Sequence, residues 1–130
     1  MFKKNLEPLT NYDLIKLSKK LKIKNFRGIF MRDNLPPKIN MIECGIVNLD
    51  SSNNNGTHWV CYHKNKAKCY YFDSFGLDPP IELKNYLKVD IELSTFQIQK
   101  LNTHQCGYYC LLVLKLLDKY DFKDIIIGLV

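Results

Sequence analysis

Two short segments, residues 57–63 and 68–73, constrain the fold more than any other part of the chain. Both are rich in aromatic and β-branched residues, and only four residues separate them. Strand-like segments joined by so short a connection are typical of an antiparallel β-hairpin. The sequence therefore predicts that these two segments pair side by side.

The register of this hairpin brings two polar residues together. If the hairpin is centred between Asn65 and Lys66, His58 lies directly opposite Asp73. Directly opposed side chains have Cβ atoms about 4.5 to 5.5 Å apart. A carboxylate there would accept a proton from one imidazole nitrogen and leave the other facing a reaction partner. A slip of one residue would place the two side chains on opposite faces.

The remaining pattern predicts an α+β fold in one domain, residues 1–130. Thr10 and Asp13 form a capping box at the start of an amphipathic helix. The paired prolines Pro79 and Pro80 precede another helix. Further helices are expected at 106–119 and 122–130, the last of which could instead be a strand, and further strands at 42–49 and 89–98. Residues 28–31 form a short apolar run that stops before paired prolines.

Cys106 is expected at the point where a polar turn becomes the apolar segment 111–117. Unpaired backbone N–H groups and the helix macrodipole favour a negative charge at such a position. A free cysteine is usually a small core residue, so the inference depends on a base that can reach it. Pairing with a histidine would favour the thiolate at neutral pH.

The other cysteines and histidines have structural interpretations. Cys110 lies one helical turn from Cys106 and is expected to be a packed side chain, although a disulfide or a second nucleophile is conceivable. Cys61, His63 and Cys69 lack the paired spacing of a zinc site, so no metal is expected. His104 is a rival base without an evident carboxylate partner.

Composition and length indicate the size of the core, the cellular compartment and the charge of the protein. The 130 residues are enough to bury roughly two-thirds of the unfolded surface in one core. An odd count of five cysteines and the absence of a signal-peptide pattern favour a reducing compartment. No apolar run approaches the roughly 18 to 20 residues of a membrane span, so a soluble protein is expected. Residues 1–40 hold ten basic and three acidic residues. This basic excess could bind a polyanion such as nucleic acid, or the lysines could simply form a solvated helix face.

Three blocks of the sequence read GTHW at 56–59, YFDSFG at 71–76 and QKLNTHQCGYYC at 99–110. Together they resemble the blocks of the adenovirus protease, adenain, and its relatives. The similarity is greatest to the proteases of Maverick/Polinton-type viruses and transposons, and more distant to ubiquitin-like-protein deconjugating proteases. It extends over most of the chain from Leu9 onward and implies a permuted papain-like fold with the nucleophile at the N-terminus of a packed helix.

The resemblance also implies roles for individual residues. Cys106 would be the nucleophile, His58 the general base and Asp73 the group that orients it. Gln99 would supply a side-chain amide to the oxyanion hole, with Gln97 and Gln105 as competing glutamines. Each of these roles is implied by the position of the residue within one of the three blocks.

The resemblance also implies roles for the turn before Cys106 and for Trp59. The turn from Asn102 to Gln105 would bring the oxyanion donor and the nucleophile to the same carbonyl. Trp59 would line a narrow channel that prefers glycine near the scissile bond, or would otherwise be a buried core tryptophan.

The expected function is that of a cysteine endopeptidase that cleaves viral structural precursors near glycine during virion maturation. The alternatives are removal of a ubiquitin-like modifier and a basic polyanion-binding module with a vestigial site. No cofactor is required, although resemblance to adenain suggests an activating peptide and DNA, the latter bound by the basic N-terminal region. The protein is expected to be a monomer without membrane association, located inside the host cell, in nucleus or cytoplasm, and in the virion.

Overall fold

A mixed five-stranded sheet forms the centre of the molecule. The computed structural model describes residues 7–53, 58–99 and 104–130. The strands lie in sequence order across the sheet, with parallel pairs at both edges and antiparallel pairs between them. The strands are β1 (Phe26–Met31), β2 (Glu43–Asn48), β3 (Trp59–Lys64), β4 (Lys68–Phe72) and β5 (Asp90–Leu93).

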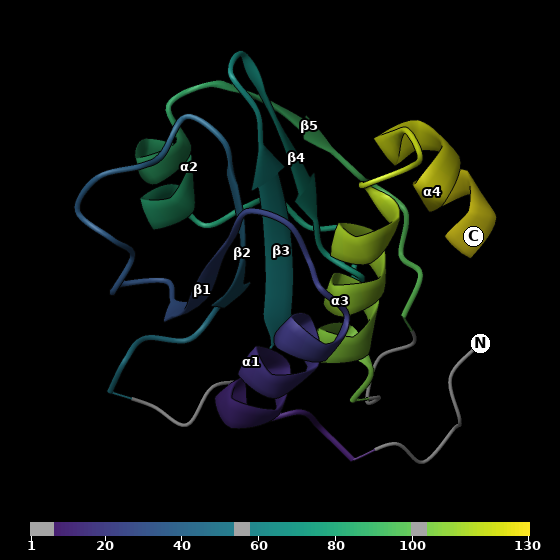
Figure 1. Ribbon diagram of the computed structural model, residues 1–130, viewed down its shortest axis with the longest axis horizontal. Helices are drawn as coiled ribbons and strands as arrows, with labels where there is room; N and C mark the ends of the chain where they lie inside the picture. Colours follow the sequence, from purple (N-terminus) through teal and green to yellow (C-terminus); the bar gives the residue numbers. More distant parts are fainter. Residues whose placement is uncertain (1–6, 54–57, 100–103) are drawn as a thin grey trace.

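Helices cover both faces of the sheet (Figure 1). On one face, α1, α3 and α4 enclose the larger apolar core, in which Leu14 and Val113 pack with Ile46 of the sheet. On the other face, α2 contributes Leu83 and Leu87 to a second apolar cluster. The helices in the described residues are α1 (Asn11–Lys20), α2 (Ile81–Leu87), α3 (Cys106–Leu116) and α4 (Phe122–Leu129).

The helix boundaries agree closely with the sequence pattern. Thr10 caps α1, and both hydrogen bonds of the capping box with Asp13 are present. Pro80 directly precedes α2, as expected for a residue with fixed φ and no N–H. The C-terminal segment, predicted as helix or strand, is the helix α4. The prediction was less accurate for α3, which ends at Leu116 rather than near residue 119.

The last predicted strand is too long. The pattern at 89–98 predicts one strand, but β5 ends at Leu93. The reason is a tertiary contact: the backbone N–H groups of Ile98 and Gln99 both donate to the carbonyl of Ser74, at 2.8 and 2.9 Å. This segment therefore follows the turn after β4 instead of continuing the sheet.

The hairpin of β3 and β4 forms as predicted, but its register differs by two residues. The observed pairs include Lys64 with Cys69, which centres the hairpin between Lys66 and Ala67. The side chain of Asn65 accepts hydrogen bonds from the N–H groups of Ala67 and Lys68, at 3.2 and 3.0 Å. Such an Asx turn fixes the position of the loop. His58 is therefore not directly opposite Asp73, and the predicted cross-strand pair is wrong in its register.

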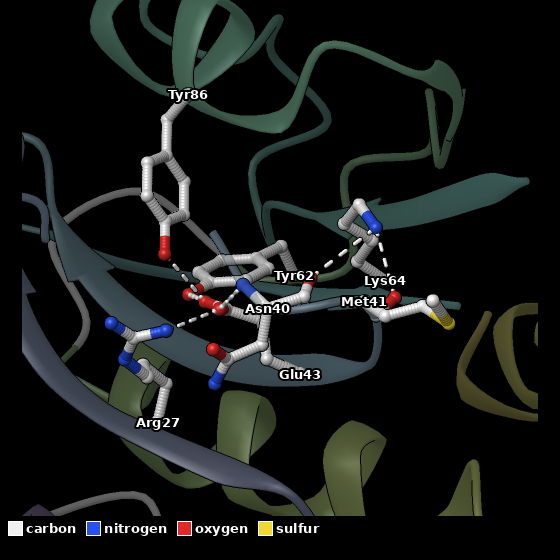
Figure 2. A network of polar contacts seen from close by, with 7 residues as sticks. All are labelled: Arg27, Asn40, Met41, Glu43, Tyr62, Lys64 and Tyr86. Atoms are coloured by element: carbon white, nitrogen blue, oxygen red, sulfur yellow. Dashed lines mark hydrogen bonds and ion pairs between the residues drawn. The ribbon is translucent and has the colours of Figure 1, made fainter. Parts of the chain in front are cut away.

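A buried carboxylate joins several elements at the far end of β3 from His58. Glu43, which is 1% exposed, receives hydrogen bonds from Arg27 at 2.9 Å, Tyr62 at 2.6 Å and Tyr86 at 2.8 Å. Figure 2 shows these groups and the backbone N–H of Asn40 converging on the carboxylate. Burial, followed by the hydrogen bond to Glu43, raises the pKa of Tyr62 far above its ordinary value. The tyrosine hydroxyl therefore stays protonated and donates, and the network ties β1, β3 and α2 to β2.

Replacing Glu43 by alanine should lower the free energy of unfolding by about 3 to 5 kcal/mol. The substitution leaves the Arg27 guanidinium and two tyrosine hydroxyls without their shared acceptor. Urea unfolding followed by circular dichroism measures the change. Lys68→Ala, which removes the exposed ion pair with Glu92, is the control and should have little effect. A Glu43→Ala protein as stable as the wild type would show that the network contributes no net stability.

Candidate active site

Three polar side chains meet where two strand ends adjoin the start of α3. His58 directly precedes β3, Asp73 directly follows β4, and Cys106 is the first residue of α3. The helix packs against β3 across the larger core (Figure 1). The hairpin and the helix therefore deliver a base, a carboxylate and a thiol to one place, although they are distant in the sequence.

His58 and Asp73 form a short hydrogen bond despite the shifted register. Nε2 of His58 lies 2.7 Å from Oδ1 of Asp73, and the two residues are 8% and 0% exposed. A register change of two residues leaves both side chains on the same face of the hairpin, and diagonal neighbours there remain within reach. The predicted contact therefore exists, through a diagonal rather than a direct pairing.

Phe75 fixes the geometry of this pair in two ways. Its backbone N–H donates to Oδ1 of Asp73 at 2.8 Å. Its ring stacks on the imidazole of His58, with centroids 4.2 Å apart and planes inclined by 10°. The carboxylate and the imidazole are thus both held by a residue of the turn after β4.

The environment of His58 favours its protonated form. Burial lowers its pKa, but hydrogen bonds and charge interactions with Asp73 and Cys106 have the larger combined effect and raise the pKa from 6.5 to about 9. Because Nε2 is bonded to Asp73, Nδ1 is the ring nitrogen left for the thiol. An imidazolium beside a sulfur atom is the arrangement that stabilises a thiolate.

Cys106 is buried, with 8% of its surface exposed. Its sulfur accepts the backbone N–H of Trp59 at 3.5 Å. Cys106 also lies close enough to His58 to help raise the pKa of that histidine. The N-cap residue Gln105 provides no side-chain cap to α3. A negative sulfur at this point would face both a peptide N–H and the positive end of the helix dipole.

Gln99 is 1% exposed, and its side chain is held by a serine. Ser74 Oγ donates to Gln99 Oε1 at 2.6 Å. Of the competing glutamines, Gln97 donates its side-chain amide to the backbone carbonyl of Gln99 at 3.2 Å, and Gln105 precedes α3. Residues 100–103, which include the first half of the turn from 102 to 105 predicted to join donor and nucleophile, lie outside the described residues.

Trp59 is half-buried beside the larger core. Its indole N–H donates to the backbone carbonyl of Leu9 at 3.1 Å, so the ring is fixed against the segment before α1. The side chain of Leu9 in turn lies against Gly107, the second residue of α3. Trp59 therefore has a packing role, and its backbone contact with the sulfur of Cys106 places it next to the site as well.

The other candidate residues are arranged differently. His104 is exposed, and burial lowers the pKa of His63. Burial also raises the pKa of Cys69 to about 12 and that of Cys110 well above its ordinary value, which keeps these thiols protonated. In residues 7–53, 58–99 and 104–130, no three histidine, cysteine or acidic side chains are grouped as metal ligands.

The fold has counterparts among solved structures. Two crystal structures of the ASFV pS273R protease, one of them of the Se-Met protein, match with TM-scores of 0.64 and 0.62. Each match has 17% sequence identity and covers 95% of this chain. The chain has the fold of a viral protease. It spans 63% and 62% of the length of those two chains, which is less than two thirds.

These matches confirm the predicted α+β, papain-like cysteine protease fold, with Cys106 at the N-terminus of a packed helix. At 17% identity these matches show the fold, and the relation to viral proteases and the Maverick/Polinton assignment stay predictions. No protein-family model and no curated protein matches the sequence. Among the described helices, none combines the length and the apolar character that crossing a bilayer requires.

Sequence reasoning did not identify two residues that contact the site. Ser74 and Phe75 follow Asp73 directly, and the sequence offered only the signal of a turn before Gly76. Gly76 has a φ of 75°, and a Cβ atom there would lie 2.8 Å from the backbone oxygens of Thr95 and Phe96. This close approach explains the glycine and brings the turn against the segment that leads to Gln99.

Proposed function

We propose that this protein is a cysteine endopeptidase with Cys106, His58 and Asp73 as its catalytic residues. The observation that carries the proposal is the position of His58, whose imidazole is hydrogen-bonded to the Asp73 carboxylate at 2.7 Å and whose pKa is raised by both Asp73 and the neighbouring Cys106. A nucleophile, a base and an orienting carboxylate gathered in one place define this chemistry irrespective of their order in the sequence. The fold, shared with a viral protease, supports the same conclusion.

The mechanism follows from the positions of these groups. The sulfur of Cys106 attacks the carbonyl carbon of the scissile peptide bond, and His58 donates its proton to the leaving amine. A water molecule then hydrolyses the thioester, with His58 accepting the proton of that water. Asp73 keeps the imidazole ring in position through both steps. The Gln99 side-chain amide and the backbone N–H of Cys106 would stabilise the oxyanion, a contribution of about 2.7 to 4 kcal/mol per donor.

The proposed substrates are viral structural precursor proteins, cleaved near glycine during virion maturation inside the host cell and in the virion. The backbone N–H of Trp59 contacts the sulfur of Cys106, and by resemblance to adenain the ring of Trp59 would line a narrow site in which a small residue fits. The glycine-rich tail of a ubiquitin-like modifier would also fit a narrow site at Trp59, so removal of such a modifier is the alternative function. The catalytic residues come from one chain, so a monomer suffices for the chemistry.

Activation by DNA or by a peptide remains part of the proposal. A cavity of about 360 Å³ opens between α1 and β1. Lys19 and Lys22 line it together with apolar residues such as Ile15 and Phe26. A basic rim of this kind suits an acidic ligand. The cavity is formed by different elements from those that carry Cys106, so a ligand there would act at a distance.

Digestion of a peptide library tests the proposed function. The wild-type protein should cleave peptides that carry glycine next to the scissile bond, and mass spectrometry of the products gives the cleavage positions. Protein treated beforehand with iodoacetamide is the control and should release no products. Cleavage of library peptides that lack glycine would exclude the narrow site at Trp59. If the protein releases a modifier from a conjugate but cleaves no library peptide, deconjugation would be the favoured function.

A further inference from the structure

Ser74 makes three hydrogen bonds that hold Gln99 and its neighbour. Its hydroxyl donates to Oε1 of Gln99 at 2.6 Å, and its carbonyl accepts the backbone N–H groups of Ile98 and Gln99. Ser74 and Gln99 are 0% and 1% exposed, so neither can exchange these bonds for water. Both the backbone and the side chain of Gln99 are thereby fixed to the turn after β4.

The hydrogen bond from Ser74 selects one of the two orientations of the Gln99 amide. The last torsion of a glutamine side chain is broad and nearly two-fold, so the amide oxygen and nitrogen can exchange places at small cost. A buried hydroxyl that donates to Oε1 breaks this symmetry. In the flipped orientation the amide nitrogen would donate to the Ser74 oxygen, and the hydroxyl proton would lose its acceptor at a buried position. With Oε1 held by Ser74, the N–H groups of the planar amide point away from the Ser74 hydroxyl.

The direction of this amide matters for a reaction that develops negative charge on oxygen. An oxyanion is stabilised by N–H donors and repelled by a carbonyl oxygen. A flipped Gln99 would turn a stabilising contact into a destabilising one. The same turn also carries Asp73, which orients His58, so adjacent residues set the base and the oxyanion donor.

We propose that Ser74 is a positioning residue that orients the side-chain amide of Gln99 as an oxyanion donor. This inference rests on the proposed protease function. Ser74 acts through Gln99 and does not touch the substrate itself. Its effect should therefore vanish when Gln99 is absent, which a purely structural role would not predict.

A double-mutant cycle tests the inference, using the best peptide from the library. Ser74→Ala should lower kcat by about tenfold to 100-fold and leave KM nearly unchanged, because the donor is misdirected rather than removed. Gln99→Ala should lower kcat by about 100-fold to 1000-fold. In the Gln99→Ala background, the further change Ser74→Ala should have almost no effect on kcat.

Two controls separate orientation from damage to the fold. Ser94→Ala removes another buried serine hydroxyl, one without a hydrogen-bond partner among the described residues, and should leave kcat unchanged. Alkylation of Cys106 by iodoacetamide forms no oxyanion, so its rate should be the same in Ser74→Ala and the wild type. Ser74→Thr keeps the hydroxyl and should recover most of the lost kcat.

The outcomes distinguish this inference from the function on which it rests. An active wild-type protein with unchanged kcat in Ser74→Ala would overturn the role of Ser74 alone. Equal, additive losses in both backgrounds would show a structural role and overturn it as well. A wild-type protein that cleaves no peptide would overturn the proposed function, and the role of Ser74 with it.

Discussion

Replacing Cys106 by alanine should abolish peptide cleavage, with a loss of about 10⁶ in kcat. The substitution removes the sulfur atom that forms the covalent intermediate, and no other group can replace it. The thiol of Cys110, one turn along α3, is fully buried, and burial keeps its pKa well above the ordinary value. Initial cleavage rates of the wild-type and variant proteins on one library peptide measure the effect.

Cys110→Ala provides the matched control for this experiment. Both substitutions remove one buried sulfur atom from the same helix, so they should have similar effects on stability. Only Cys106→Ala should lose activity, while circular dichroism should show both variants folded. Cleavage that persists in Cys106→Ala would contradict the protease proposal. Unchanged DNA binding and biological activity in that variant would favour the basic polyanion-binding module instead.

The local elements and the pairing of the site could be predicted because they depend on short-range patterns. The capping box specified the start of α1, and the strand composition specified the hairpin. The hairpin register was wrong because the Asx turn at Asn65 moves its centre by one position. His58 and Asp73 nevertheless meet, because alternation has a period of two and an even shift keeps both on the same face.

Other features depend on contacts that no local pattern reveals. Ser74 and Gln99 are 25 positions apart, and their contact diverts the segment after β5 from the sheet. Glu43 reads as an ordinary strand residue, yet donors from β1, β3 and α2 converge on it. In both cases a buried polar group needs a partner, and only the tertiary arrangement decides which residue supplies it.

Replacing His58 by glutamine should lower kcat by about 10⁴-fold or more, since the variant has neither a base nor an acid at this position. Glutamine keeps a polar side chain of similar size, which limits damage to the fold. The imidazolium is also expected to stabilise the negative sulfur of Cys106. Alkylation by iodoacetamide at about pH 6.5 should therefore be at least about tenfold slower in the variant.

The raised pKa of His58 predicts the direction in which activity and stability change with pH. The pKa of His58 is raised from 6.5 to about 9 in the folded protein, so the ring stays protonated through neutral pH. The value of kcat/KM should fall as the pH rises through about 9, where the proton for the leaving amine is lost. The stability that protonated His58 contributes should be complete below pH 6.5 and disappear as the pH rises through about 9.

Urea unfolding of the wild type and His58→Gln, repeated across this range, measures that contribution. The stability difference between the two proteins should be largest at the acidic end and shrink toward pH 9, because only the wild type releases the His58 proton there. The fall in kcat/KM should have its midpoint near pH 9, whereas the stability difference should decline over the whole interval from 6.5 to about 9. A fall in kcat/KM centred near 6.5, or a stability difference that stays constant between 6.5 and 9, would mean that Asp73 and Cys106 do not hold the imidazolium, and the proposed ion pair would be excluded.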